Sequence, residues 1–351
     1  LRAMGLASGD APIARRARSY KAAFGECHPM NPVDVVVLGS YVQDHCWVTE
    51  TFPGDGESRI GRFSTGPGGK GFNQAVACHR QRVGTAFLGA IGRDALGATA
   101  QAYAADNGIA AIWEERDDAT TAASSILVDA SGQNRIVVAL GANEKLSVAF
   151  VAGHRQAIHD AQVLVCQCEN ELAATREALA TARRHDTLTL LNPAPINPRM
   201  SAELLALADI ATPNETEFAF LLRHLYGRQV APDYWELADP LLHALCRSTG
   251  IPTVVITLGD KGCFVSHGDA PVRKDGETYY RVRAEPVRCV DSTGAGDAYT
   301  GGLAAGLVLY REQPFRRAVE HANRVAALAV EKPGTAPAMP TRAEVLARFG
   351  S

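Results

Sequence analysis

The stretch Val33-Asp-Val-Val-Val-Leu-Gly-Ser40 decides the fold class of this chain. Its short run of branched apolar residues predicts a strand that is buried on both faces. The pattern recurs further along the chain, at 162–166, 187–191, 209–212 and 253–258. Alanine- and leucine-rich segments of helix length separate many of these runs. This alternation predicts an α/β fold with a doubly wound, mostly parallel sheet and helices on both faces.

Polar residues directly follow the predicted strands. Gly39-Ser40 follows the first strand, Glu169 follows the second and Asn192 the third. Ligands of doubly wound folds bind beyond the carboxyl ends of the strands. We therefore expect a binding site to be built from the residues at these strand ends.

Two segments depart from the alternation. Residues 120–141 predict a β-hairpin around the turn Asp129-Ala-Ser-Gly-Gln133, and residues 46–65 have a strand-like pattern. We expect the two segments to pair into a small sheet that covers the site as a lid and excludes water. The alternative is a surface hairpin without a role in catalysis.

Composition excludes several classes of protein. The chain has 351 residues with 35 basic and 38 acidic side chains, and it has neither a basic stripe for nucleic acid nor an apolar run for a membrane span. Its 8 cysteines lack a repeated metal-binding spacing, which favours reduced thiols and a cytoplasmic location. Residues 1–31 are predicted to be a flexible N-terminal extension, and the alternative is a misassigned start, with Met30 as the native first residue.

The segment Gly294-Ala-Gly-Asp297 precedes apolar residues at helical spacing. Small residues at a helix start let successive N–H groups point at one anion. Asp297 at the rim could then remove a proton from an attacking hydroxyl, which together implies phosphoryl transfer to an alcohol. The alternative is a capped helix without catalytic function.

A second glycine cluster spans Gly66-Pro-Gly-Gly-Lys-Gly-Phe-Asn-Gln74. Gly68 and Gly69 allow the backbone to approach a ligand closely, Lys70 offers a positive charge, and Asn73 can donate to and accept from hydroxyl groups. The cluster is not a Walker A sequence, and no Gly-x-Gly-x-x-Gly follows the first strand.

Taken in order, these motifs resemble the ribokinase family of sugar kinases. The resemblance runs from Val33 to Pro340 and implies an ATP-dependent carbohydrate kinase domain over residues 32–351. The motifs that carry it are Gly39-Ser40 with Asp44, Gly68-Gly-Lys-Gly-Phe-Asn73, Asn192-Pro-Ala-Pro195, Thr212-Pro-Asn-Glu-Thr-Glu217, Thr257-Leu-Gly-Asp-Lys-Gly262 and Asp291-Ser-Thr-Gly-Ala-Gly-Asp297.

The resemblance also implies roles for individual residues. It makes Asp297 the catalytic base and Gly294, Ala295 and Gly296 the anion hole that stabilises the transferring phosphate. It assigns sugar contacts to a set that includes the base, namely Asp44, Gly68, Gly69, Lys70, Asn73, Glu169 and Asp297. It assigns ATP and its magnesium ion to Asn214, Glu217, Thr257, Gly259, Gly262 and Asn323.

Two further properties follow only from the resemblance. Members of the family use potassium to shape the anion hole, and the matching residues are Asp291, Thr293, Lys332 and Gly334. A hydroxyl group is often found near the position of Ala338, and Thr335 is a possible substitute here. Family members often dimerise through the lid strands, so we expect a homodimer.

One position departs from the family pattern. Ribokinases carry Asn two residues before the matching Asp of the first motif, and Val42 occupies that place here. A buried hydroxyl without a partner costs about 1–3 kcal/mol, so Val42 would weaken ribose binding. D-ribose phosphorylated at its 5-hydroxyl is the first hypothesis, and 2-deoxyribose, another pentose or a nucleoside is the second. A non-catalytic sugar-binding relative is the third.

Overall fold

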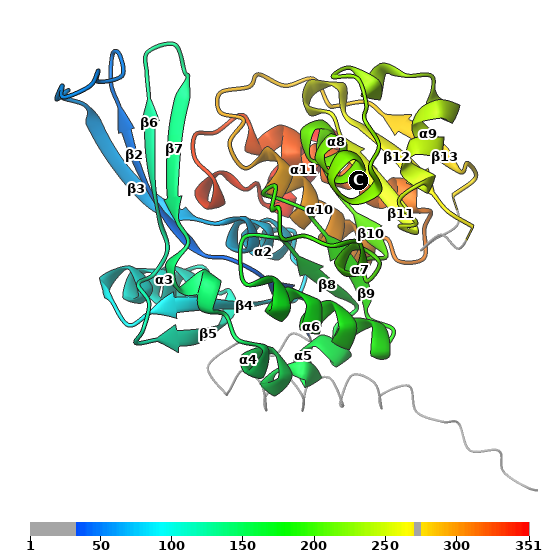
Figure 1. The fold of residues 1–351 in the computed structure, drawn as a ribbon, viewed down its shortest axis with the longest axis horizontal. Helices are drawn as coiled ribbons and strands as arrows, with labels where there is room; N and C mark the ends of the chain where they lie inside the picture. Colours follow the sequence, from blue (N-terminus) through cyan, green and yellow to red (C-terminus); the bar gives the residue numbers. More distant parts are fainter. Residues whose placement is uncertain (1–32, 270–274, 351) are drawn as a thin grey trace, which may run out of the picture.

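The described residues of this computed structural model, 33–269 and 275–350, form a large and a small β-sheet (Figure 1). The large one is nine-stranded, in the order β13-β12-β11-β10-β9-β8-β1-β4-β5. Neighbouring strands from β5 to β11 are parallel, and β12 and β13 are antiparallel at one edge, which confirms the predicted fold class. The strands are β1 (Val35–Leu38), β4 (Thr85–Gly92), β5 (Ala110–Arg116), β8 (Val163–Cys166), β9 (Leu188–Leu191), β10 (Ile210–Ala211), β11 (Thr253–Thr257), β12 (Cys263–His267) and β13 (Tyr279–Val282).

Helices cover both faces of the large sheet because its strands are apolar on both sides. Val35 and Val37 of β1 pack into one core, and Val36 and Leu38 pack into the other. The first core is covered by α2 (Lys70–Arg80), α3 (Ala95–Asp106), α10 (Ala295–Leu309), α11 (Phe315–Ala329) and α12 (Arg342–Phe349). The second is covered by α4 (Val148–Gly153), α5 (Arg155–Asp160), α6 (Leu172–Arg184), α7 (Ala202–Leu205), α8 (Glu215–Tyr226) and α9 (Asp239–Arg247).

Helix α10 is packed unusually close to its neighbours because of its glycines. A Cβ at Gly301 would lie 2.4 Å from the carbonyl oxygen of Gln74 in α2, and one at Gly306 would lie 2.8 Å from Cα of Ala318 in α11. Side chains at these positions would push the three helices apart. The close packing brings the start of α10 against the start of α2, where the two glycine clusters meet.

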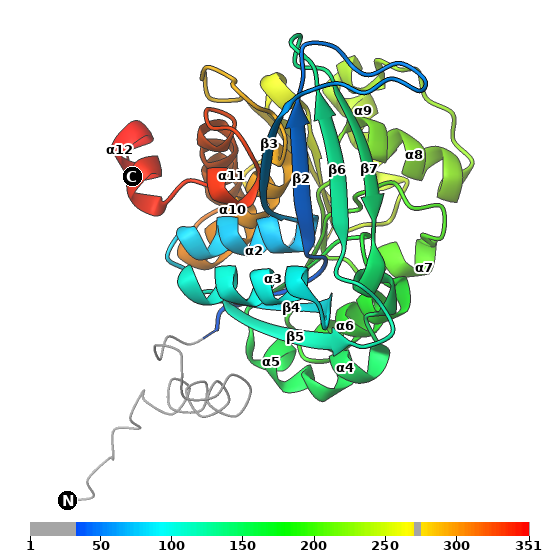
Figure 2. The same ribbon diagram turned by 90° about the vertical axis from the view of Figure 1, so that its left-hand side faces the viewer.

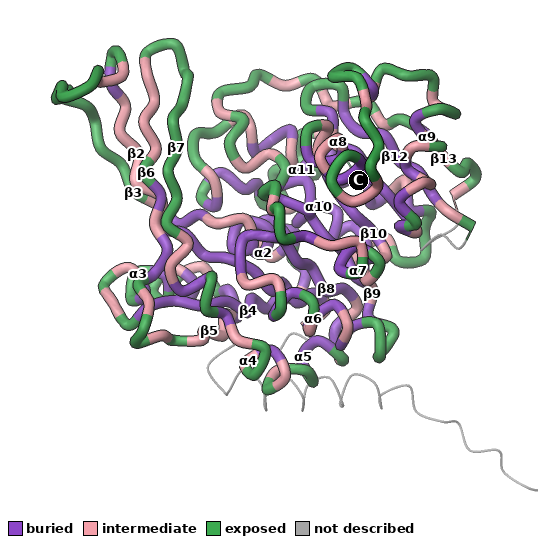
Figure 3. Tube along the Cα trace, viewed as in Figure 1, coloured by how far each residue is buried: buried purple, intermediate pink, exposed green. Residues whose placement is uncertain are grey.

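The small sheet has the strand order β3-β2-β6-β7 (Figure 2), and it projects away from the large sheet (Figure 1). Strand β2 follows β1 almost directly. The segment that contributes β2 and β3 therefore runs from Val42 to Gly68, beyond both ends of the predicted segment 46–65. The outer ends of β2 and β6 are half-buried, the outer part of β3 is exposed, and every residue of β7 is exposed (Figure 3). The strands are β2 (Val42–Val48), β3 (Arg62–Gly68), β6 (Ala123–Val128) and β7 (Asn134–Ala139).

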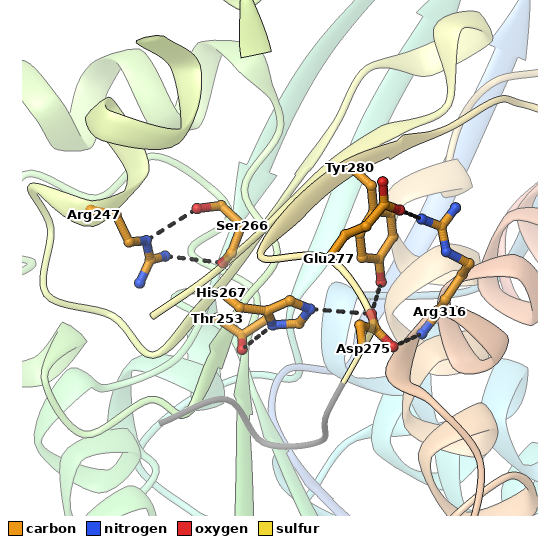
Figure 4. Close-up of polar contacts among 8 residues, drawn as sticks. All are labelled: Arg247, Thr253, Ser266, His267, Asp275, Glu277, Tyr280 and Arg316. Carbon is orange, nitrogen blue, oxygen red and sulfur yellow. Dashed lines mark hydrogen bonds and ion pairs between the residues drawn. The ribbon is translucent and has the colours of Figure 1, made fainter. Parts of the chain in front are cut away.

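A buried polar network fastens the antiparallel edge of the large sheet to α11 (Figure 4). His267 lies with Nε2 3.2 Å from Oδ2 of Asp275 and with Nδ1 3.0 Å from the hydroxyl of Thr253. The hydroxyl of Tyr280 and the backbone N–H of Arg316 both donate to the Asp275 carboxylate. One buried carboxylate therefore joins β12, β13 and the first turn of α11.

Two predictions from composition can be compared with the structure. The cysteines among the described residues are all free, and most are buried, which agrees with reduced thiols. None of the helices described here is long and apolar enough to cross a membrane. The predicted extension at 1–31 lies outside the described residues.

The segment 222–250, to which the sequence assigns no function, contains the end of α8, one short 3₁₀ helix and α9. Arg247 at the end of α9 donates to the backbone carbonyl and hydroxyl of Ser266 in β12. The 3₁₀ helices are η1 (Gly141–Lys145), η2 (Tyr234–Glu236), η3 (Gly259–Lys261) and η4 (Ala336–Ala338).

Candidate active site

The predicted site residues gather where the strand order reverses, between β1 and β8. Ser40 follows β1 and Glu169 follows β8, and the hydroxyl of Ser40 donates to Oε2 of Glu169 at 2.6 Å. The backbone N–H of Lys70, at the start of α2, donates to the same oxygen at 2.9 Å. Since both donors engage Oε2, the other oxygen of this buried carboxylate has no partner within the described chain.

Asp297 lies in the first turn of α10 and is only 6% exposed. Its two carboxylate oxygens each accept one amide hydrogen bond from α2. Nδ2 of Asn73 donates to Oδ2 at 2.9 Å, and Nε2 of Gln74 donates to Oδ1 at 3.0 Å. The structure thus joins the two glycine clusters that the sequence separates by more than 200 positions.

The residues before Asp297 form a tight turn into the helix. Gly294 has φ 77°, a left-handed conformation that favours glycine, and α10 begins at the next residue. The N–H of Ala295 already donates to the carbonyl of Ser292 at 3.2 Å. The N–H groups of Gly296 and Asp297 lie in the first helical turn, where intrahelical acceptors are lacking, and the helix dipole favours an anion there.

Asp44 projects from β2 on the same side as Val42, because alternate residues of a strand share a face. Oδ1 of Asp44 accepts from the hydroxyl of Ser124 at 2.6 Å. Burial raises the pKa of the Asp44 carboxyl, and the bond from Ser124 opposes this rise. Gln43 points to the other face, where its Nε2 donates to the hydroxyl of Thr65 at 2.7 Å. Gln43 therefore does not replace the amide that Val42 lacks.

Lys70 places a positive charge among the acids of the site. Its burial acts to lower the pKa of the ammonium group, but the carboxylates of Asp297 and Glu169 outweigh burial, and the pKa is raised. Lys70 therefore stays charged near neutral pH. Its Nζ makes no hydrogen bond or ion pair within the described residues, so all three of its donors can reach a ligand.

The glycines next to Lys70 allow close contacts within the protein itself. A Cβ at Gly68 would lie 2.1 Å from Oδ2 of Asp44, and one at Gly69 would lie 2.6 Å from the backbone nitrogen of Val42. Gly69 also has φ 89°. The sequence predicts that a ligand approaches these glycines closely. In the structure, the carboxylate of Asp44 lies in the space that a side chain at Gly68 would need.

Asn214 and Glu217 form the N-terminal capping box of α8. Oδ1 of Asn214 accepts from the N–H of Glu217 at 2.8 Å, and Oε2 of Glu217 accepts from the N–H of Asn214 at 2.9 Å. Burial raises the pKa of Glu217, although the hydrogen bond from the backbone N–H of Asn214 acts to lower it. Within residues 33–269 and 275–350, no group of three His, Cys, Asp or Glu side chains could hold a metal ion. Any magnesium here would thus depend on water and phosphate oxygens as well.

The residues expected at the nucleotide base lie further along the same sheet edge. Thr257 forms an isolated parallel bridge with Asn214, which links β11 to the capping box. Gly259 begins η3 and Gly262 follows it, with φ 56° and φ 87°. Asn323 in α11 is 7% exposed, and its Nδ2 donates to the carbonyl of Arg283 at 3.1 Å.

The loops expected to hold potassium are fastened to each other by Asp291. Its Oδ1 accepts from the N–H of Thr293 at 2.9 Å, and its Oδ2 accepts from the N–H of Gly334 at 2.9 Å. The side chain of Lys332 instead turns to Glu344 in α12, with Nζ 2.5 Å from Oε1. The structure thus brings together the backbone of these loops.

Two buried amides of the site, Gln74 and Gln167, are given no role by the sequence. Gln167 follows β8, and its Nε2 donates to Oε1 of Gln74 at 2.7 Å. Nε2 of Gln74 also donates at 3.1 Å to Oδ1 of Asn192, which the sequence predicts at the site because it follows a strand. The same location at a strand end is the signal that could have identified Gln167.

Known proteins resemble this chain over nearly its whole described length. The profile of the pfkB family of carbohydrate kinases matches residues 33–342. A ribokinase of Haemophilus influenzae is 35% identical over 315 residues, covering 89% of this chain and 97% of the relative. The mouse ribokinase is 34% identical over 313 residues, with 89% and 93% covered. A deoxyribokinase of Salmonella typhimurium is 29% identical over 311 residues, with 88% and 96% covered.

Solved structures have the same fold. The ribokinase of Giardia lamblia superposes with a TM-score of 0.79 at 27% identity, and covers 91% of this chain and 100% of its own. The Arabidopsis thaliana ribokinase, solved with ribose and ATP, superposes with a TM-score of 0.74 at 25% identity, with 90% and 97% covered. At this coverage, the similarity extends over nearly the whole of the described chain.

Proposed function

This chain belongs to the pfkB family of carbohydrate kinases, the family to which the ribokinase resemblance of its motifs points, and we propose that it transfers the γ-phosphoryl group of ATP to the 5-hydroxyl of D-ribose. The observation that carries the proposal is the contact between Asn73 and Asp297. A buried carboxylate in the first turn of α10 thus contacts the sugar motif, and an acceptor hydroxyl and a phosphoryl group would meet there.

Asp297 acts as the general base in this proposal. Its carboxylate accepts the proton of the 5-hydroxyl as the hydroxyl oxygen attacks the γ-phosphorus, and the bond from that phosphorus to the bridging oxygen breaks, so that ADP leaves. A positioned base of this kind is worth about 10²–10⁴ in rate. The N–H groups of Gly296 and Asp297 stabilise the charge on the transferring phosphoryl oxygens. Lys70 adds a positive charge to the same space.

The sugar lies between the two sheets in the proposed complex. Asp44 and Glu169 accept hydrogen bonds from its hydroxyl groups, and Asn73 offers a buried Oδ1 that has no partner among the described residues. The small sheet acts as the lid and excludes water from the phosphoryl group. Gly68 and Gly69 keep β3 close enough to β2 for this arrangement.

ATP occupies the edge of the sheet beyond β10 and β11, with Thr257, Gly259, Gly262 and Asn323 around its base and ribose. Magnesium neutralises the phosphates when it is bound. The capping box uses only Oε2 of Glu217, so Oε1 could accept a hydrogen bond from a water molecule bound to magnesium. Asn214 holds that carboxylate in place.

We further propose that potassium binds between the loops that Asp291 joins. The carbonyl groups of Thr293, Lys332 and Gly334 are the ligands in this proposal. The two hydrogen bonds to Asp291 support it, since they already hold both loops at one carboxylate. The ion would fix the loop that leads to Gly294 and the anion hole.

A homodimer through the small sheet and a cytoplasmic location complete the proposal. β7 is an edge strand, and its exposed side chains include Ile136, Val137 and Val138, of which Val137 is 74% exposed. An exposed apolar edge strand favours pairing with a second copy.

The cytoplasmic location is supported by the cysteines. Those of the described chain are all free, which is typical of proteins from a reducing compartment such as the cytoplasm.

One observation favours a second substrate. Val42 is 3% exposed on the sugar face of β2 and has no group that could pair with a hydroxyl. A sugar without that hydroxyl, such as 2-deoxyribose, or a nucleoside would lose nothing there. Turnover of ATP with ribose, 2-deoxyribose and adenosine as separate acceptors tests the proposal. Phosphorylation of ribose supports the proposal. A preference for 2-deoxyribose or adenosine would make that acceptor the substrate in place of ribose. No phosphoryl transfer to any of the three acceptors would overturn the proposal.

A further inference from the structure

Gln74 is a buried polar side chain at the centre of the site. It is 0% exposed, and its amide uses all of its hydrogen-bonding groups except one lone pair. Nε2 donates to Oδ1 of Asp297 at 3.0 Å and to Oδ1 of Asn192 at 3.1 Å. Oε1 accepts from Nε2 of Gln167 at 2.7 Å. Because its side chain is fully buried, Gln74 can affect a substrate only through these partners.

The surroundings allow one orientation of the Gln74 amide. Two acceptor oxygens face Nε2, from Asp297 and Asn192, and one donor faces Oε1. The Nδ2 group of Asn192 is itself committed to the carbonyl of Thr212 at 2.8 Å, which leaves Oδ1 of Asn192 toward Gln74. Turning the Gln74 amide over would set its oxygen against a carboxylate and a carbonyl oxygen.

The donor that fixes this orientation, Gln167, has a specific place in the fold. It follows β8, is 0% exposed, and its Oε1 is buried without a partner in the described chain. A Cβ at Gly39, after β1, would lie 1.9 Å from that Oε1. The Gly39 of the first motif therefore leaves the space in which the amide of Gln167 lies.

We propose that Gln74 is a positioning residue for the base Asp297 and that Gln167 acts on Asp297 only through Gln74. The inference rests on the proposed role of Asp297. Asn73 and Gln74 each hold one carboxylate oxygen, so two donors fix the plane of the Asp297 carboxylate. Gln167 keeps the donor end of Gln74 toward the base.

Gln74→Met tests this role, because it keeps the length of the side chain and removes the donor. The rate of phosphoryl transfer should fall about tenfold, which corresponds to the loss of one hydrogen bond to a charged group. The loss should appear in kcat, and KM for the sugar should change less than about twofold, since a misplaced base slows the transfer step and leaves the sugar contacts in place. KM for ATP should change less than about twofold, because Gln74 touches no residue assigned to the nucleotide.

Gln81→Met is the matched control. Gln81 ends α2, is 0% exposed, and its Nε2 donates to the carbonyl of Pro340 at 2.7 Å, away from Asp297. Its replacement should lower thermal stability as much as Gln74→Met does and leave kcat in place. A kcat that falls equally in both variants, or in neither, would overturn the proposal.

The two single variants Gln74→Met and Gln167→Met and their combination test the second half of the proposal, that Gln167 acts on Asp297 only through Gln74. If Gln167 acts only through Gln74, the double variant is no slower than Gln74→Met alone. Multiplying effects would show that Gln167 acts independently and would overturn this half.

Crystal structures of wild type and Gln74→Met separate this inference from the proposed function, because no turnover is needed. An Asp297 carboxylate that turns away from its wild-type orientation in Gln74→Met supports the positioning role whichever sugar the enzyme uses. An unchanged orientation overturns that role even if ribose is phosphorylated.

Discussion

The hydroxyl of Thr335 lies 3.4 Å from Oδ2 of Asp44 and donates to the carbonyl of Pro67 at 3.1 Å. Thr335 directly follows Gly334, whose N–H is bonded to Asp291. The loop proposed to hold potassium is therefore in contact with an acid proposed to hold the sugar. The hydroxyl expected near Ala338 is absent, and that of Thr335 is turned toward the sugar side.

Thr335→Val should couple two effects. Removing the hydroxyl releases the loop from β3 and from Asp44, so we expect sugar affinity to fall about fivefold and the potassium concentration for half-maximal rate to rise. Calorimetric sugar binding and a potassium titration at fixed ionic strength measure the two effects. Thr99→Val, which removes an exposed hydroxyl in α3, is the control. A flat response of the wild-type rate to potassium would contradict the proposed cation site.

The pKa of Asp44 predicts how sugar binding depends on pH. Burial raises this pKa, and the hydrogen bond from Ser124 lowers it. The ionised carboxylate accepts from sugar hydroxyls, so sugar affinity should fall as the pH drops through the pKa. Ser124→Ala removes the opposing bond and should move this loss to higher pH.

Calorimetry with sugar at a series of pH values measures the shift. Ser125→Ala is the matched control, since Ser125 is the next residue of β6 and is exposed on its other face. Equal curves for wild type and Ser124→Ala would show that Asp44 does not control sugar affinity.

The fold could be predicted from the sequence because its signals are local. Runs such as 33–38 and 253–258 are apolar almost without interruption, and a sheet covered on both faces satisfies that pattern. The structure places strands β1 and β11 in these segments. Glycines such as Gly301 carry no such signal, since their role depends on which helix packs against them.

The site was predictable at the glycine motifs and the charged residues, and less so at its buried amides. Asp297 and Lys70 each stand beside a run of small residues, a local pattern that is typical of anion binding. Gln74 and Gln167 acquire their role only from partners far away in the chain, so no local pattern marks them. The capping box of Asn214 could have been predicted from its spacing to Glu217.

Val42→Asn tests the choice of sugar. An amide at this buried position can pair with a sugar hydroxyl that Val42 leaves unsatisfied, which is worth about 1–3 kcal/mol. The ratio of kcat/KM for ribose to that for 2-deoxyribose should therefore rise about 5- to 150-fold. The ratio is its own control for general damage to the enzyme. An unchanged ratio would mean that Val42 does not face the sugar.

Asp275→Asn should weaken the edge of the large sheet in a way that depends on pH. Burial raises the pKa of Asp275, but hydrogen bonds from His267, Tyr280 and the start of α11 outweigh it, so the pKa lies below its ordinary value of 3.8. The stability that this group contributes is present above pH 3.8 and is lost as the pH falls through the lowered pKa.

Urea unfolding should give a loss of about 1–3 kcal/mol for Asp275→Asn at pH 7, and a smaller difference from wild type at about pH 3. Glu277→Gln, which removes an exposed partner of Arg316, should change stability by less than about 0.5 kcal/mol. A difference for Asp275→Asn that stays constant with pH would exclude the lowered pKa as its source.

The most direct test of the account follows phosphorus from ATP to the sugar. Purified protein with ATP, magnesium, potassium and ribose is examined by ³¹P NMR, beside Asp297→Asn, which keeps the shape of the side chain without its basicity. We predict a sugar 5-phosphate signal with wild type and a rate lower by about 10²–10⁴ with the variant. A phosphate on another position of the sugar, or equal rates for the two proteins, would contradict Asp297 as the base for the 5-hydroxyl.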